Sequence, residues 1–173
     1  MNKADLTQAW DYFRTVNGVG LRAIAAIPEG KLDATAIPGM RSPKAIVIHQ
    51  YQVLKDLTAS AATGTLVDST PFEEAAAAKI HTLAELLAWC RSCWDEGDRT
   101  VAGLTDAQLV AMIKTPWGHD FPGSVMFRYV NDEYWHHRGQ LYCFLRALGV
   151  TPPGLYSTSE NDPAFKDKAK AGT

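Results

Sequence analysis

Residues 124–149 read SVMFRYVNDEYWHHRGQLYCFLRALG, and no other part of the chain says more about its architecture. Apolar residues recur there at spacings of three and four, which places them on one side of an α-helix. They are Met126, Val130, Leu141, Phe144 and Leu148. Gly149 is typical of a helix C-terminus, and the prolines that follow at 152 and 153 prevent continuation. The pattern predicts a long amphipathic helix that ends at this glycine.

An acid and an imidazole interrupt the apolar side of this helix. Glu133 and His137 are four residues apart, so one helical turn stacks them on the same face. Carboxylate oxygen and imidazole nitrogen both bind borderline divalent metals. Burying ionisable groups without partners is costly, so the pair indicates part of a metal site. A surface pair with only a weak contact across the turn fits the same spacing.

Three earlier segments show helical periodicity with recognisable boundaries. The first covers about residues 5–27. The second begins at Ser42, an N-cap serine followed by proline, and ends near Gly64. The third begins at Thr70 and extends to the region of Gly97 or somewhat beyond. All three carry an apolar stripe suited to packing against other helices.

Together these segments predict an all-α protein built as a four-helix bundle. The third helix is expected to open with a capping box, in which Glu73 reaches back to the Thr70 amide. Residues 114–123 are rich in proline, glycine and aromatic residues and predict a short connection or small hairpin before the last helix. We expect one metal-binding domain over residues 1–155 and a polar C-terminal tail at 156–173. The connections permit a simple antiparallel order or one with crossovers.

His49 is the candidate for a third metal ligand. It lies three residues after Ile46 and four before Val53, on the same helical face. A single helical histidine is commonly a hydrogen-bonded packing residue, and that interpretation stays open. If His49 instead meets Glu133 and His137, the set leaves a coordination position for water or substrate, as in catalytic sites.

His136 offers another spacing, Glu133-x-x-His136, which occurs in di-iron bundles. Such sites need a second motif of this kind, and the glutamates elsewhere do not form one; they are Glu73, Glu74 and Glu85. His136 lies about 100° around the helix from His137. We therefore expect it to form hydrogen bonds beside the ligands.

Composition narrows the class of protein. The net charge is -2, and no basic cluster occurs before the last few residues, which argues against nucleic-acid binding. No apolar stretch approaches the roughly 18 residues of a membrane span, and the first residues lack the apolar core of a signal peptide. Three cysteines are too few for a disulfide scaffold, so we expect a cytoplasmic protein. Cys90 and Cys93 have redox-motif spacing but lie within a predicted helix, where a packing role is expected.

Residues 133–142, EYWHHRGQLY, followed by Leu145, Arg146 and Gly149, resemble the fourth-helix signature of the DinB-like (DinB/YfiT) family. The resemblance extends over about residues 5–153, although only the last helix is distinctive. It implies a four-helix bundle that holds nickel, zinc or a similar divalent ion through three ligands, usually histidines. Relatives of this family include thiol-dependent S-transferases and a thiol-dependent maleylpyruvate isomerase.

By this resemblance His49 and His137 correspond to family ligands, whereas Glu133 stands where the family usually has a histidine. A carboxylate also suits zinc, manganese or iron; the alternative is a site that has lost its metal. The resemblance implies a small-molecule substrate, with a low-molecular-weight thiol as one candidate. Hydrolysis by metal-activated water is a competing reaction. A catalytically inactive bundle that binds a ligand or dimerises is the alternative to an enzyme, and homodimers are common among such bundles.

Four further residues are candidates for contacts around the site. Arg138 and Gln140 either contact substrate or pair with their helix neighbours. Trp117 and His119, in the connection before the last helix, are candidates for the pocket mouth. Gly139 in mid-helix costs roughly 1 kcal/mol relative to alanine, which predicts a close approach of another helix.

Overall fold

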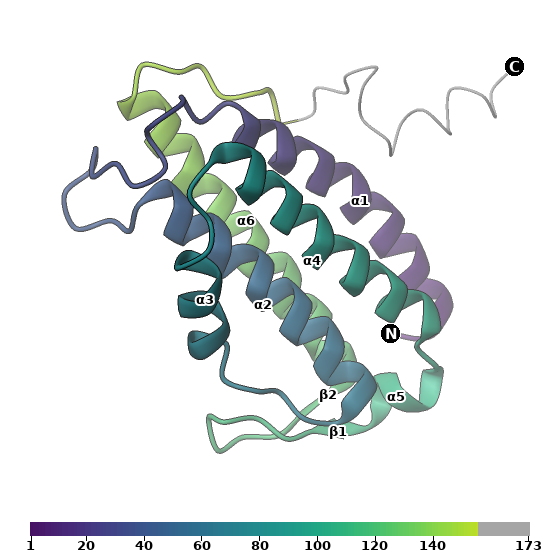
Figure 1. Cartoon of the computed structure of the whole chain (residues 1–173). Coiled ribbons are helices and arrows are strands. Elements are labelled where there is room, and N and C mark those ends of the chain that lie inside the picture. The colour runs from purple at the N-terminus through teal and green to yellow at the C-terminus, as the bar shows by residue number, and fades with distance from the viewer. Residues whose placement is uncertain (156–173) are drawn as a thin grey trace, which may run out of the picture.

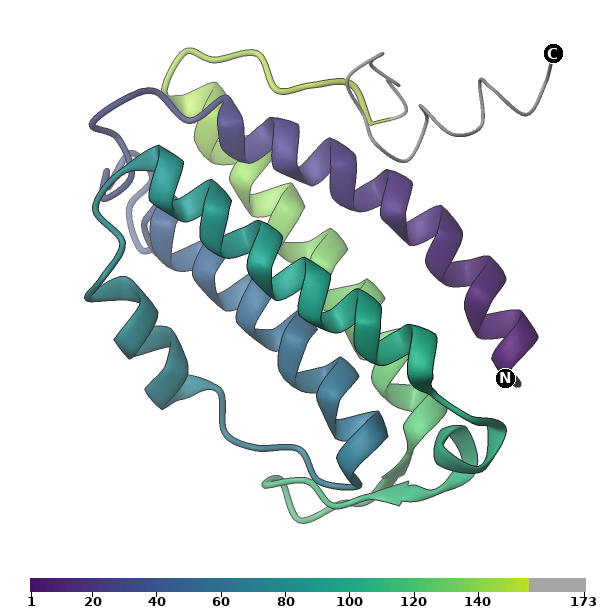
Figure 2. The ribbon, with the colours of Figure 1, turned by 45° about the vertical axis from the view of Figure 1, so that its right-hand side comes forward.

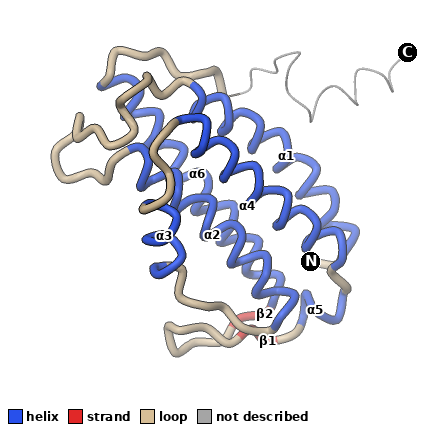
Figure 3. Tube along the Cα trace, in the orientation of Figure 1, coloured by secondary structure: helices blue, strands red, loops and turns tan. Residues whose placement is uncertain are grey.

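The computed structural model describes residues 1–155, and most of them are helical (Figure 3). The predicted C-terminal tail, 156–173, lies outside the described residues. Four long helices form the bundle: α1 (Lys3–Ala25), α2 (Pro43–Thr63), α4 (Leu83–Gly103) and α6 (Gly123–Ala147). Helices α1 and α6 run in one direction and α2 and α4 in the other (Figure 1). The predicted all-α four-helix bundle is confirmed.

Four short elements connect the long helices. They are α3 (Thr70–Ala77), α5 (Asp106–Val110), β1 (Met112–Ile113) and β2 (Phe121–Pro122). The two strands are antiparallel and pair Met112 with Pro122 and Ile113 with Phe121. This confirms the small hairpin expected before the last helix. Within the described part of the chain, no helix combines the length and hydrophobicity needed to cross a lipid bilayer.

The order of the helices includes crossovers, which the sequence pattern left open. Helix α2 packs mainly against α4 and α6, and α1 packs against the same two helices. Helices α1 and α2 are therefore diagonal in the bundle although they are consecutive in the chain. Because α2 and α4 run in the same direction, the chain must return along the bundle between them (Figure 2). Helix α3 lies on this return path and packs against α2.

The third predicted helix was wrong in extent, because the chain breaks it into α3 and α4. Helix α3 ends at Ala77, and α4 begins at Leu83 after a direction change. The new start has a complete capping box: Thr82 accepts from the Glu85 amide, and Glu85 accepts from the Thr82 amide. These two bonds satisfy orphan donors at the helix start, which is why the helix begins there.

The predicted capping box at the start of α3 does not form. The Thr70 amide donates to Asp68 Oδ1 at 2.9 Å instead of to Glu73. The Glu73 side chain is thereby available to a partner outside its own helix.

A buried polar cluster joins α1, α2 and α6 close to the candidate site. Tyr51 donates to Asn17 Oδ1 at 2.7 Å, and the Tyr134 hydroxyl lies 3.2 Å from the same oxygen. Gly20 makes room for it, since a Cβ at this position would lie 2.0 Å from the Tyr134 hydroxyl oxygen. The close approach expected at Gly139 is absent: that residue is exposed, and an added Cβ would meet no atom within 4 Å.

Candidate metal centre

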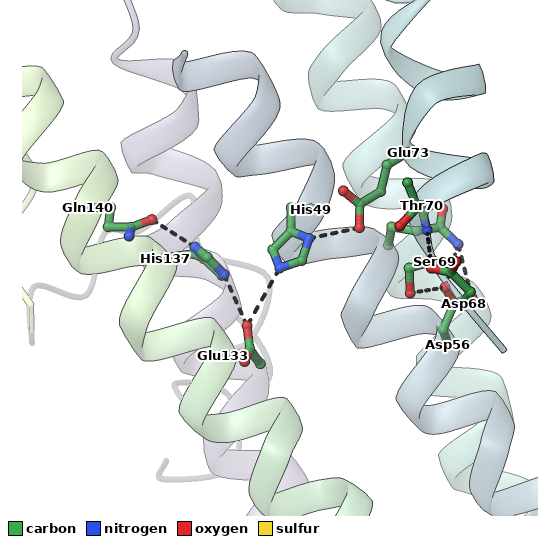
Figure 4. A network of polar contacts seen from close by, with 10 residues as sticks. His49, Asp56, Asp68, Ser69, Thr70, Glu73, Glu133, His137 and Gln140 are labelled. Carbon is green, nitrogen blue, oxygen red and sulfur yellow. Dashed lines mark hydrogen bonds and ion pairs between the residues drawn. The ribbon is translucent and has the colours of Figure 1, made fainter. Parts of the chain in front are cut away.

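Two neighbouring helices bring His49, Glu133 and His137 to one place (Figure 4). His49 comes from α2, and the other two come from adjacent turns of α6. One ligand atom from each residue can be chosen so that all lie within 4.8 Å of one another. The two imidazole rings are 4.7 Å apart between centroids and nearly perpendicular, at 87°. The antiparallel packing of α2 on α6 therefore unites donors that are far apart in the chain.

Both imidazoles turn the same ring nitrogen toward the Glu133 carboxylate. His137 Nε2 lies 3.0 Å from Glu133 Oε2, and His49 Nε2 lies 3.7 Å from the same oxygen. Donor atoms bound tetrahedrally at about 2.0–2.1 Å from a zinc ion are about 3.3 Å apart. The two observed separations bracket this value. The described residues thus fit a small divalent cation once the donor atoms, which lie within 4.8 Å of one another, close to this spacing.

His49 is held from its outer side by Glu73 of helix α3. His49 Nδ1 donates to Glu73 Oε1 at 2.7 Å, and both side chains are 21% exposed. An ionised carboxylate only accepts hydrogen bonds, so the proton belongs on Nδ1 and the Nε2 lone pair points toward Glu133. Metal-binding histidines commonly have such an outer carboxylate, which fixes the ring and its tautomer.

His137 has an outer partner from its own helix. Its Nδ1 donates to Gln140 Oε1 at 2.8 Å, and Gln140 Nε2 is 3.0 Å from His136 Nε2. Burial lowers the pKa of His137, and the nearby His49 lowers it further, against the opposing effects of Gln140 and Glu133. The neutral ring that a metal ligand requires is therefore favoured near neutral pH.

The neutral His137 ring faces more hydrogen-bond acceptors than it has protons, which favours a bound cation. Acceptor oxygens face both of its ring nitrogens, from Gln140 on one side and from Glu133 on the other. A neutral imidazole carries one proton and can satisfy only one of them. Because burial disfavours the doubly protonated ring, a metal between Nε2 and Glu133 suits this arrangement best.

A cavity of about 400 Å³ opens beside the three donors. His49, Glu73 and Glu133 lie in its wall, whereas His137 is buried behind them. The remaining wall comes from α2, the segment before α3, the first residue of α3, the hairpin and α6: Val53, Leu57, Leu66, Val67, Asp68, Ser69, Thr70, Pro116, Trp117 and Tyr129. A small molecule in this cavity would contact two of the three donor residues.

The other residues singled out in the sequence occupy different positions relative to the cavity. Trp117 lines the cavity and forms an edge-to-face pair with Tyr129 at 6.1 Å. His119 is exposed and is not part of the cavity wall. Arg138 is buried with its guanidinium 3.9 Å from the Trp135 ring centroid, so it packs within the bundle and not in the cavity. His136 and Gln140 form the hydrogen-bonded chain behind His137.

Cys90 and Cys93 do not form a redox site, although they have the spacing of a redox motif. Both cysteines lie within α4 and are buried and free. Burial raises the pKa of both thiols, that of Cys93 to about 12. They are packing residues, as the sequence suggested.

Glu73 is the residue near the site that sequence reasoning assigned to the wrong partner. Its position three residues after Thr70 suggested a capping box, and the true partner, His49, lies 24 residues earlier. Sequence reasoning missed Tyr129, on the cavity wall, although it precedes Glu133 by one helical turn. That spacing is the only feature that pointed to it.

Comparison with known proteins agrees with this architecture. The family model of the DinB family matches residues 1–170. A DinB-like protein (YjoA) from Bacillus subtilis has a similar crystal structure, with a TM-score of 0.66 and 18% sequence identity over 84% of this chain and 93% of that one. At this identity the likeness concerns the fold. No curated protein matches the sequence significantly.

Proposed function

This chain belongs to the DinB family, and from that premise we propose that it binds one divalent metal through His49, Glu133 and His137 and acts as a metal-dependent enzyme on a small molecule. The observation that supports this most directly is the orientation of the two imidazoles. Each presents Nε2 to the Glu133 carboxylate, while its Nδ1 is bonded to an outer oxygen. Histidines that only pack in a core do not need both Nε2 atoms directed at one carboxylate.

The donor set indicates the kind of metal. Imidazole nitrogen suits zinc and nickel, and the carboxylate extends the range to manganese and iron. Two histidines and one glutamate form a set found in catalytic zinc sites that keep a position for water or substrate. We therefore propose zinc or nickel as the resident ion, with manganese or iron as the alternatives.

The bound ion and the surrounding residues would have separate roles in the reaction. A bound divalent ion would supply a nucleophile at neutral pH by lowering the pKa of a coordinated water or thiol. Glu73 and Gln140 hold the two imidazoles in position. The apolar part of the cavity wall, including Leu57 and Leu66, would hold the substrate beside His49 and Glu133.

Two reactions fit this arrangement. The family resemblance favours transfer of a low-molecular-weight thiol to a small electrophile, in the reducing cytoplasm where thiols are abundant. Hydrolysis by activated water needs the same donors and no thiol. Turnover of an activated electrophile with and without added thiol separates them, since only the transferase depends on the thiol concentration.

Metal analysis of protein produced without a histidine tag tests the proposal. We expect about one equivalent of zinc or nickel in the wild type, because a mononuclear site holds one ion. His49→Ala and His137→Ala should lose most of it. His81→Ala is the matched control, since His81 is exposed and outside the centre. Equal and negligible metal in all four proteins would favour a catalytically inactive bundle.

A further inference from the structure

The cavity beside the metal centre has a distinctive charge. Three carboxylates line it, from Asp68, Glu73 and Glu133, and its described wall contains no lysine or arginine. Lys114, on the hairpin next to this wall, forms a salt bridge with Asp120. We propose that the substrate is a cationic small molecule, with an apolar or aromatic body and a protonated amine or similar nitrogen. This rests on the proposed function, because the cavity is the one that adjoins the metal centre.

The three carboxylates differ in how far they are neutralised. Glu133 would share the charge of the ion, and one oxygen of Glu73 already accepts from His49. Asp68 faces no such partner in the cavity: its Oδ1 accepts the Thr70 amide, and this bond lowers the pKa of the Asp68 carboxyl. A divalent ion offsets two of the three negative charges. The cavity with metal bound therefore keeps one, which attracts a cation and repels an anion.

The uncharged part of the wall suits the other end of such a molecule. Val53, Leu57 and Leu66 give it an apolar side. Trp117 and Tyr129 add two aromatic rings, paired edge to face at 6.1 Å. Aromatic faces attract ammonium groups and also pack against apolar rings. A molecule with an amine at one end and a ring at the other would use both parts of the wall.

Calorimetric titration with two matched probes tests the inference on zinc-loaded protein at low salt. Phenethylamine is protonated at pH 7, whereas phenethyl alcohol has nearly the same shape and no charge. We expect the amine to bind roughly tenfold more tightly, and this preference to shrink at high salt as the charges are screened. Asp68→Asn keeps the acceptor for the Thr70 amide but removes the charge. It should reduce the preference roughly twofold to fivefold, as for an exposed charge pair.

Asp95→Asn is the control, because Asp95 is an exposed carboxylate on α4 outside the cavity. It should leave the preference unchanged. Equal affinities, tighter binding of the alcohol, an unchanged preference in Asp68→Asn or no binding of either probe would overturn the inference.

Repeating the titration on metal-free protein separates this inference from the proposed function. Without the ion the cavity has more negative charge, so the preference for the amine should increase. If the protein holds no metal but still selects the amine through Asp68, the proposed function fails and the inference stands. If the metal binds and the two probes bind alike, only the inference fails.

Discussion

Replacing Glu73 with alanine tests whether the short crossover helix α3 controls the metal centre. Glu73 Oε1 accepts from His49 Nδ1 at 2.7 Å, and no other described contact holds that nitrogen. Without the carboxylate, the ring can change tautomer or rotate, and Nε2 is then less often presented to the metal. The expected result is weaker metal binding with an intact fold, because only one side of a short helix changes.

The size of the effect follows from the position of the pair. Loss of an outer hydrogen bond to a metal-binding histidine costs about 10-fold to 100-fold in metal affinity, or about 1.4–2.7 kcal/mol. Both side chains are 21% exposed, so water can partly replace the lost carboxylate. We therefore expect a loss near the lower end, about tenfold, for Glu73→Ala. Glu73→Gln keeps an acceptor oxygen without its charge and should lose roughly threefold.

Zinc affinity can be measured at pH 7 by competition with a chromophoric chelator, with circular dichroism as a check of folding. Glu74→Ala is the matched control, because Glu74 is the next residue of α3 and is exposed. If Glu73→Ala bound zinc as tightly as the wild type and the Glu74 variant, the reasoning about His49 orientation would be refuted.

Four further results are expected. Gly20→Ala should destabilise the fold by about 1–3 kcal/mol in chemical denaturation, because its Cβ would overlap the Tyr134 hydroxyl. Gly139→Ala, which meets no atom, should stabilise it by up to about 1 kcal/mol, and equal effects of the two changes would contradict the packing described here. At pH 8 a thiol reagent should modify only the exposed Cys143, because thiolate is the reactive form and the two buried thiols stay protonated; the pKa of Cys93 is about 12. Denaturant should make all three thiols reactive. Rapid reaction of all three thiols in the native protein would contradict this prediction. Removal of metal by a chelator should lower the melting temperature, because free zinc at 100 times its dissociation constant adds about 2.7 kcal/mol of stability. Re-addition of zinc should restore the melting temperature. A melting temperature that the chelator does not change would count against a native metal site.

The sequence alone determined the features that depend on neighbouring residues. Apolar spacing and end signals located the long helices, such as the N-cap at Ser42, whose side chain accepts from the Ala45 amide. The stacking of Glu133 and His137 followed from the helical repeat, because residues four apart always share a face. The chemical nature of the donors is also a property of the residues themselves. These inferences needed no knowledge of how the helices pack.

Only the tertiary structure decided which helices meet and in which direction they run. A periodic apolar stripe shows that a helix has a buried side, but it does not identify the helix that packs against that side. The meeting of His49 with the pair on α6 therefore depends on the crossover order of the bundle. The same order sends α3 back along α2, where Glu73 bonds to His49 instead of capping its own helix. The Glu73 carboxylate can either cap its own helix or bond to His49. Helix packing decides between the two, because it sets the distance between Glu73 and His49.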